Sequence, residues 1–110
     1  MTDAIEIDAA ALKAMLDADT VLLVDVREPA EFAAGHIPGA INKPLSTFDA
    51  AALHAPAGKT VVLQCAGGKR SGMALEKCAA ARASIDTHLA GGIGAWAAAG
   101  LPVVKPADRG

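Results

Sequence analysis

The chain has few cysteines, no long apolar run and no large excess of charge of either sign. It contains only two cysteines in 110 residues, and its net charge is −2 at pH 7. A disulfide scaffold usually needs more cysteines, and a structural zinc site needs about four Cys or His ligands at close spacing. Because the three histidines are scattered, we expect no metal and no other cofactor. Acids and bases are mixed along the chain, so we expect no nucleic-acid binding through a basic field.

A membrane span is also absent from the sequence. No stretch approaches the roughly 18 consecutive apolar residues that a spanning helix needs. The first ten residues, MTDAIEIDAA, have neither the basic nor the apolar part of a signal peptide. We therefore expect no membrane contact by this segment and favour a cytoplasmic location. The sequence is equally compatible with a domain cut from a longer, even membrane-anchored, protein.

Strand-like and helix-like patterns alternate along the chain. The length suits one domain over residues 1–110, with a polar tail from 104 onward. The β-branched runs VLLVDV (21–26) and TVVLQ (60–64) are typical of strands buried on both faces. Shorter strands are expected at 40–42 and 87–90, and helices at 8–17, 29–34, 47–54, 71–83 and 92–99. This alternation predicts an α/β fold with a mainly parallel central sheet.

Several helix ends have recognisable signals. Asp8 is expected to cap the first helix and Pro29 to open the second. Ser46 or Thr47 is expected to cap the third helix, and Gly100 to close the last.

The sequence CAGGKRSG (65–72) places a cysteine directly after the second strong strand. Ligands of open α/β sheets bind beyond the carboxyl ends of the strands, which makes Cys65 the leading site candidate. Gly67 and Gly68 permit a tight turn whose N–H groups converge on one point.

Positive charge is concentrated in the same loop. The helix expected to start near Ser71 adds the positive end of its dipole, and Lys69 and Arg70 add two cations. These features are expected to lower the pKa of the Cys65 thiol from its usual value of about 8.5 and so to favour the reactive thiolate. The competing interpretation is an inert buried thiol.

Other loop chemistries fit less well. A Walker phosphate loop requires a Ser or Thr after Gly-Lys, and Arg70 occupies that position. No local signature of a papain-like protease is present. Cysteine phosphatases use a Cys-x5-Arg loop, whereas Cys65 and Arg70 form the shorter Cys-x4-Arg. The shorter loop makes a narrower cradle, better matched to one sulfur atom than to a phosphate.

Three segments in this order resemble the rhodanese family of sulfurtransferases. They are LLVDVREPAEFAAGHIPGAINKPL (22–45), CAGGKRS (65–71) and LAGGIGAWAAAGLPV (89–103). The resemblance covers nearly the whole chain, and the ordered set is far more specific than any one segment. It implies a three-layer rhodanese-like fold, with helices on both faces of the sheet.

The resemblance also implies a sulfurtransferase chemistry with a small anionic donor. The Cys65 thiolate would take the outer sulfur of a donor such as thiosulfate, and cyanide or a protein or small thiol would then accept it. The N–H groups from Ala66, Gly67, Gly68, Lys69, Arg70 and Ser71 would hold the outer sulfur, while the two cations attract the donor. Many family members have Arg directly after the cysteine, where this chain has Ala66. The alternatives are a weakly catalytic sulfur-relay or regulatory binding domain, and a phosphatase or arsenate reductase.

Asp25 lies at the end of the first strong strand and Arg27 follows that strand, and both are candidates for supporting the site. Asp25 could orient the loop or pair with Arg27, but the favoured role is structural, as a strand-end carboxylate that caps local N–H groups. Arg27, Glu28 and Glu31 are expected to form a local ion network.

Three further residues are expected to have structural roles. His36 is expected to stabilise a turn, and Trp96 to lie in the core. Cys78 shares a face of its helix with Ala74 and Leu75, so we expect packing rather than a disulfide with Cys65.

Overall fold

Five parallel strands form the central sheet in the computed structural model, which describes residues 4–105. The order across the sheet is β1-β5-β4-β2-β3, so the carboxyl ends of all five strands meet at one edge. The strands are β1 (Ile5–Ile7), β2 (Val21–Asp25), β3 (Ile41–Asn42), β4 (Thr60–Gln64) and β5 (Thr87–Leu89). The predicted α/β class and parallel sheet are confirmed.

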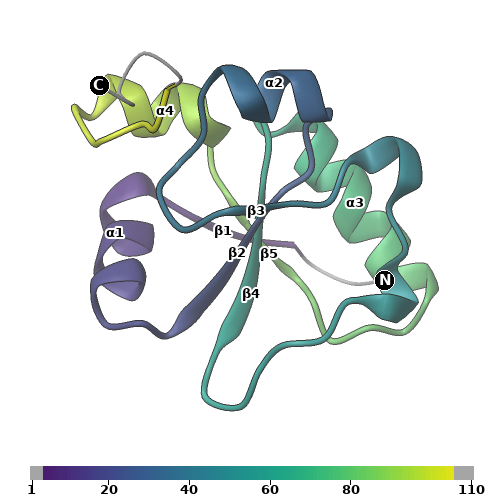
Figure 1. Ribbon diagram of the computed structural model, residues 1–110. Coiled ribbons are helices and arrows are strands. Elements are labelled where there is room, and N and C mark those ends of the chain that lie inside the picture. The colour runs from purple at the N-terminus through teal and green to yellow at the C-terminus, as the bar shows by residue number, and fades with distance from the viewer. Residues whose placement is uncertain (1–3, 106–110) are drawn as a thin grey trace.

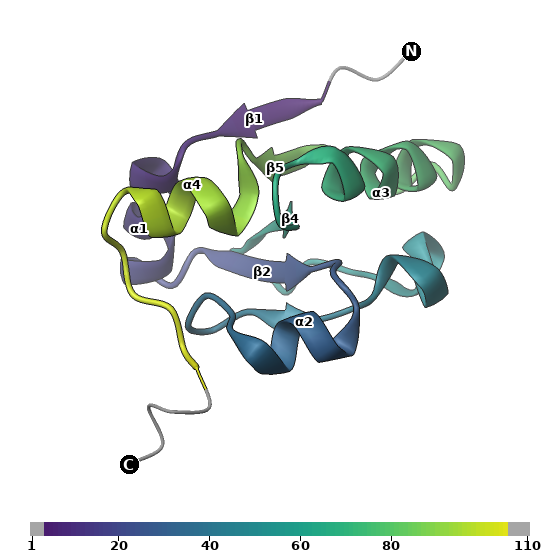
Figure 2. The same cartoon turned by 90° about the horizontal axis from the view of Figure 1, so that it is seen from above.

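Helices cover both faces of the sheet and give a three-layer fold, as the resemblance implied. The helices are α1 (Ala9–Asp17), α2 (Pro29–Ala34), α3 (Lys69–Ala80) and α4 (Gly92–Ala98), with two short 3-10 turns, η1 (Leu45–Thr47) and η2 (Ala50–Ala52). Figures 1 and 2 show α1 and α4 together on one side of the strands and α3 on the other. The short α2 crosses the end of the sheet at which β2 and β4 terminate (Figure 1).

Alternating side chains of the central strands separate the core into two clusters. Val62 on β4 faces α1 and α4, where it lies in one cluster with Leu12 and Trp96. Leu63, the next residue, belongs to the other cluster with Ala74 and Leu75 of α3. The carboxyl end of β4, which leads into Cys65, therefore lies between the two helical layers.

Local signals explain several element boundaries. The Asp8 carboxylate accepts a hydrogen bond of 2.8 Å from the N–H of Ala11, which confirms the predicted cap of α1. Pro29 opens α2 as expected, and Gly100 follows α4 with a φ of +78°. The helix α3 begins at Lys69 instead of 71, because Gly68 takes a left-handed conformation that starts the helix earlier.

The helix expected at 47–54 is wrong. Phe48 and Asp49 adopt extended backbone angles between η1 and η2. The Asp49 carboxylate bonds the N–H of Ala51, so Asp49 caps a new turn instead of continuing a helix. The Ser46 hydroxyl donates to Glu28 at 2.7 Å and caps no helix.

Two further features concern the ends of the chain. The three-residue strand β1 was not predicted, because its short sequence IEI lacks an extended apolar run. Val104, the first residue of the expected tail, pairs with His36 in an antiparallel bridge. Residues 106–110 of that tail lie outside the described residues. None of the helices within 4–105 is long and apolar enough to cross a membrane.

Candidate active site

Cys65 follows β4 directly and lies at the edge of the sheet where all strands end. Only 1 % of its surface is exposed. Its sulfur accepts a hydrogen bond from the N–H of Gly68 at 3.0 Å and lies 3.6 Å from the hydroxyl oxygen of Ser71. The loop therefore turns back on itself so that the groups following Cys65 face its sulfur.

One of the two loop glycines is required by the backbone. Gly68 has a φ of +106°, a conformation that residues with a Cβ rarely adopt, and it lies immediately before α3. Gly67 has no positive φ, and a Cβ added there meets nothing within 4 Å. Ala66 and Gly67 are both exposed, so the outer side of the loop faces solvent.

The loop favours the ionised form of Cys65. Burial raises the pKa of this thiol, but the N–H of Ser71, the Ser71 hydroxyl and the N–H groups of Gly68 and Gly67 together outweigh burial and lower it. The direction agrees with the sequence expectation. The main stabilising groups are the converging hydrogen-bond donors, and the two cations are not among the main causes.

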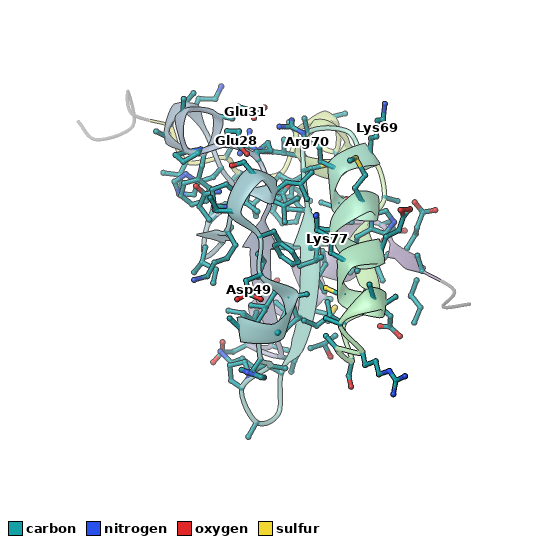
Figure 3. The ribbon with its side chains drawn as sticks, turned by 90° about the vertical axis from the view of Figure 1, so that its right-hand side faces the viewer. Glu28, Glu31, Asp49, Lys69, Arg70 and Lys77 are labelled. Atoms are coloured by element: carbon teal, nitrogen blue, oxygen red, sulfur yellow. The ribbon has the colours of Figure 1, made fainter. Side chains whose placement is uncertain are left out.

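The two loop cations are used differently. Arg70 makes a bidentate ion pair with Glu31 of α2, with N–O distances of 2.6 and 2.9 Å. The Arg70 guanidinium and the N–H of Glu28 lower the pKa of the Glu31 carboxyl to about 2. Figure 3 shows Arg70 directed toward Glu31, while Lys69 extends from the opposite side of α3. Among the described residues, Lys69 has no hydrogen-bond or ion-pair partner.

Asp25 and Arg27 form a buried ion pair beside the loop. Asp25 is fully buried and opposite Gln64 in the sheet, and its carboxylate accepts hydrogen bonds of 2.7 to 3.0 Å from the Arg27 side chain. Arg27 also donates to the carbonyl of Gly35 at 2.6 Å. The pair thus ties the end of β2 to the segment after α2. The expected ion network differs from the prediction: Arg27 pairs with Asp25, and Glu31 pairs with Arg70. The Arg27 charge still contributes to the lowered pKa of the Glu31 carboxyl.

The first turn of α4 packs against the backbone of the cysteine loop. The N–H groups of Ile93 and Gly94 donate to the carbonyls of Cys65 and Ala66 at 2.8 and 3.1 Å. A Cβ added to Gly92 would collide with the Cys65 carbonyl oxygen and lie 2.7 Å from the Ala66 carbonyl carbon. The GGIG sequence (91–94) therefore has a role that its pattern alone did not indicate, which is close contact with the loop.

A polar side chain that the sequence did not single out also reaches the loop. His88 on β5 is buried, and its Nδ1 lies 2.8 Å from the hydroxyl oxygen of Ser71. Its Nε2 lies 3.3 Å from a carboxylate oxygen of Glu6 on β1. The sequence signal available was a histidine in the short strand expected at 87–90, but only the fold shows that this histidine is buried beside Ser71 and Glu6.

The three residues for which a structural role was expected have such a role in the fold. Cys78 is fully buried among apolar side chains, its pKa is raised by that burial, and both cysteines are free thiols. His36 contacts the Phe32 carbonyl and stacks on the Phe32 ring, as expected for a turn. Trp96 is buried and donates to the Pro102 carbonyl.

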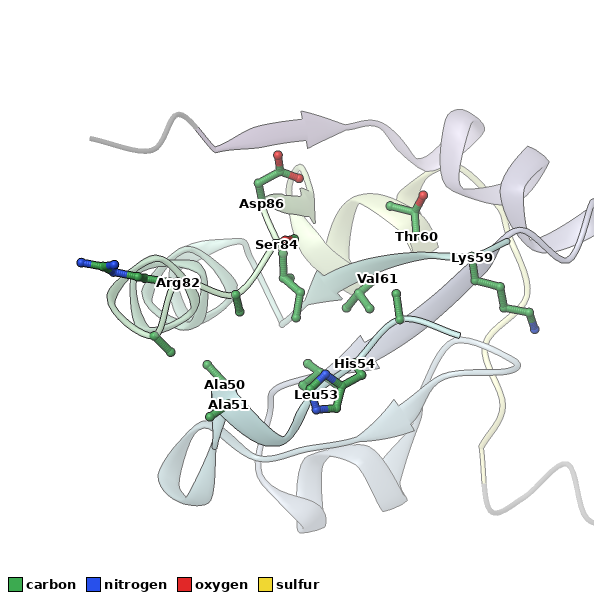
Figure 4. A pocket seen from close by; sticks show the side chains of 14 residues that line it. Ala50, Ala51, Leu53, His54, Lys59, Thr60, Val61, Arg82, Ser84 and Asp86 are labelled. Carbon is green, nitrogen blue, oxygen red and sulfur yellow. The ribbon is translucent and has the colours of Figure 1, made fainter. Parts of the chain in front are cut away.

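The pocket in Figure 4 lies away from this site. It has a volume of about 610 Å³ and is lined by the start of β4, the η2 segment and the turn after α3. Thr60 lies at the opposite end of β4 from Cys65, so this pocket and the cysteine loop are separate features. No three His, Cys, Asp or Glu residues within 4–105 are grouped as metal ligands would be.

Comparisons of the sequence and the fold with known proteins point to the same family. The family model of the rhodanese-like domain matches residues 8–99 of the sequence. A sulfurtransferase of Allochromatium vinosum is 40 % identical over 102 residues, which are 92 % of this chain and 95 % of the relative. The thiosulfate:glutathione sulfurtransferase of Saccharomyces cerevisiae is 38 % identical over 82 residues, or 63 % of this chain and 58 % of the relative.

A longer relative and a solved structure are also similar to this chain. The uncharacterized protein slr1261 of Synechocystis is 46 % identical over 94 residues, and the match covers 86 % of this chain but only 52 % of that relative. The crystal structure of a rhodanese-related protein from Thermoplasma volcanium has a TM-score of 0.75 and 33 % identity, covering 91 % of this chain and 97 % of that one.

Replacing Gly92 with alanine is expected to damage the loop. The new Cβ would meet the carbonyls of residues 65 and 66, and a left-handed φ adds about 1–3 kcal/mol of strain. Gly100→Ala is the matched control, because its φ is also positive but nothing lies within 4 Å of the added atom. We expect Gly92→Ala to lose more stability than Gly100→Ala in urea unfolding and, unlike it, to change Cys65 alkylation. Equal effects of the two substitutions would contradict this packing role.

Removing the Asp25 charge is expected to destabilise the fold. Asp25→Asn leaves the buried Arg27 guanidinium without a counter-charge, which typically costs about 3–5 kcal/mol. The exposed Asp17, which pairs with Lys13 one turn away on α1, provides the control, and Asp17→Asn should cost no more than about 0.5 kcal/mol. Denaturant unfolding of both variants measures the difference, and similar losses would show that the buried pair is not a structural tie.

Proposed function

Because the chain belongs to the family of rhodanese-like domains, we propose that it transfers a sulfane sulfur through a persulfide on Cys65. The observation that supports this most is the donation of the Gly68 N–H to the Cys65 sulfur at 3.0 Å. The same hydrogen bond belongs to a set that lowers the pKa of the thiol. The thiolate is the nucleophilic form of the cysteine, and thiosulfate is the proposed donor.

In the first half-reaction the Cys65 thiolate attacks the outer sulfur of thiosulfate. A new S–S bond forms to Cys65, the S–S bond of thiosulfate breaks, and sulfite leaves with the electron pair of that bond. The negative charge moves from the Cys65 sulfur to the outer sulfur of the persulfide. The N–H groups of Gly67, Gly68 and Ser71 are suited to receive this displaced charge, since they already face the Cys65 sulfur.

In the second half-reaction a thiophilic acceptor attacks the outer sulfur. Cyanide would leave as thiocyanate, and a thiol would leave as a persulfide that retains the thiol proton. In both cases the bond between the two sulfurs breaks and the Cys65 thiolate is restored. No external oxidant or reductant is needed, because the sulfane sulfur is passed between nucleophiles.

The charge around the loop favours a small anionic donor. Arg70 is already paired with Glu31, so part of its charge is neutralised. Ala66 supplies no cation where many family members have arginine. Lys69 is therefore the loop cation we assign to attracting the donor. The name of the yeast relative, a thiosulfate:glutathione sulfurtransferase, supports thiosulfate as donor and a small thiol as one acceptor.

Thiosulfate is expected to add the mass of one sulfur atom to the intact protein. Cys65→Ser should abolish the addition, whereas Cys78→Ser should retain it, because Cys78 is packed in the core. Intact-mass spectrometry before and after addition of cyanide measures gain and loss of the sulfur. A Cys65→Ser protein that still gains the sulfur would disprove the proposed persulfide.

Lys69→Ala is expected to weaken capture of thiosulfate. Loss of one exposed charge contact corresponds to a rise in KM of roughly two- to fivefold, with little change in kcat. Lys77→Ala is the matched control, since Lys77 is exposed on the same helix but farther from the loop (Figure 3). Steady-state assays with varied thiosulfate test this. An unchanged KM for Lys69→Ala, or equal changes for both variants, would exclude the assigned role.

A further inference from the structure

A continuous line of polar contacts leads from Cys65 to the surface. The Cys65 sulfur lies 3.6 Å from the hydroxyl oxygen of Ser71, which lies 2.8 Å from Nδ1 of His88. On the other side of the ring, Nε2 of His88 lies 3.3 Å from a carboxylate oxygen of Glu6. Cys65, Ser71 and His88 are buried, while 61 % of the Glu6 side chain is exposed.

The sheet fixes the geometry of this line. His88 on β5 is the direct register partner of Glu6 on the edge strand β1 and of Leu63 on β4. Ser71 lies in the first turn of α3 and faces the ring from above the sheet edge. Both ring nitrogens of His88 are thus engaged, one by a hydroxyl and one by a carboxylate. Such pairing determines which nitrogen carries the proton.

The Ser71 hydroxyl has one proton and several neighbours. Its oxygen lies near the Gly68 carbonyl at 3.2 Å as well as near His88 and Cys65. If the Glu6 carboxylate holds the imidazole proton on Nε2, then Nδ1 accepts from Ser71, and the hydroxyl oxygen is open to accept the S–H of Cys65. If Nδ1 is also protonated, it donates to Ser71, whose own proton then points to the thiolate.

We propose that His88 is a positioning residue that controls the ionisation of Cys65 through the Ser71 hydroxyl. In this step the S–H bond of Cys65 breaks and its proton passes to the Ser71 oxygen, while the Ser71 proton passes to Nδ1 of His88. The Glu6 carboxylate stabilises the resulting imidazolium at Nε2. The step is a pure proton transfer that leaves a thiolate and an imidazolium separated by one hydroxyl.

The charged residues on the elements that surround His88 are few. Among the described residues, β1 contributes Glu6, which contacts the ring, and β4 contributes only the apolar Leu63 at this position. Gly72 of α3 lies beside the His88 ring, and Lys69, Glu76 and Asp86 line a surface groove with Gly72 but make no hydrogen bond or ion pair with His88 in the described part of the chain. Glu6 is therefore the charged residue that contacts the ring directly.

This inference deepens the proposed function and rests on it only for its consequence in catalysis. A buried thiol that attacks thiosulfate must first lose its proton. The line to Glu6 offers this proton a path from the buried sulfur to solvent. The ionisation itself is a property of the free protein and is measured without any sulfur donor.

The ultraviolet absorbance of the thiolate as a function of pH tests the inference. The chain has no tyrosine, so no phenolate absorbance overlaps the thiolate signal. In a Cys78→Ser background Cys65 is the single thiol. We expect its titration midpoint to lie below about 8.5, the usual value of a free cysteine. The midpoint belongs to the coupled Cys65–His88 pair.

His88→Asn retains a hydrogen-bonding group near Ser71 but cannot accept the proton. We expect it to raise the midpoint by about one pH unit, which is a tenfold loss of thiolate at a fixed lower pH. The sign follows because the thiolate loses a group that stabilises its charged form. His54→Asn, at an exposed histidine outside this line, is the matched control and should leave the midpoint unchanged.

A double substitution distinguishes the proposed action of His88 through Ser71 from a general structural role of His88. Because His88 acts through Ser71, Ser71→Ala should itself raise the midpoint, and adding His88→Asn to it should change nothing further. Glu6→Gln, at an exposed position, should raise the midpoint by a smaller amount. If the His88→Asn protein does not fold, an unchanged midpoint in both Ser71→Ala and Glu6→Gln overturns the inference.

The outcomes distinguish this inference from the proposed function. A folded His88→Asn protein that titrates like its parent overturns the proton path, even if thiosulfate still adds sulfur to Cys65. A raised midpoint together with no sulfur gain in the parent protein supports the proton path and refutes the proposed transfer reaction.

Discussion

The stabilisation of a negative charge on a nearly buried sulfur is the constraint on which the rest of the site depends. Desolvation alone would keep Cys65 protonated and inert. The loop offsets it with hydrogen-bond donors from Gly67, Gly68 and Ser71, all within six residues of the cysteine. These donors can converge only because β4 ends at Gln64, Gly68 adopts a left-handed conformation and α3 begins at once.

Neighbouring elements hold this loop from several sides. The first turn of α4 donates hydrogen bonds to the carbonyls of Cys65 and Ala66, which fixes the backbone of the loop where it leaves β4. Arg70 ties the start of α3 to Glu31 of α2, and the Asp25–Arg27 pair ties β2 to the segment beyond α2. A preorganised site needs such support, because donors that had to reorient during the reaction would stabilise its charge less.

The features that depend on a local sequence pattern could be predicted from the sequence. The two long apolar runs became β2 and β4, Asp8 and Pro29 started helices, and Cys65 was placed at the sheet edge. The helix expected at 47–54 does not form, because the Asp49 carboxylate accepts a hydrogen bond from the N–H of Ala51 and so caps a separate short turn.

The contacts that could not be predicted from the sequence join residues that are far apart in the chain. Arg70 meets Glu31, Gly92 meets the Cys65 carbonyl, and His88 lies between Ser71 and Glu6. The last of these needs β1, a strand of three residues too short to recognise. The most direct test of the account is a crystal structure of the protein after reaction with thiosulfate. It should show one additional sulfur bonded to Cys65 and enclosed by the N–H groups of residues 66–71. An unmodified Cys65, or an added sulfur directed away from those N–H groups, would contradict the account.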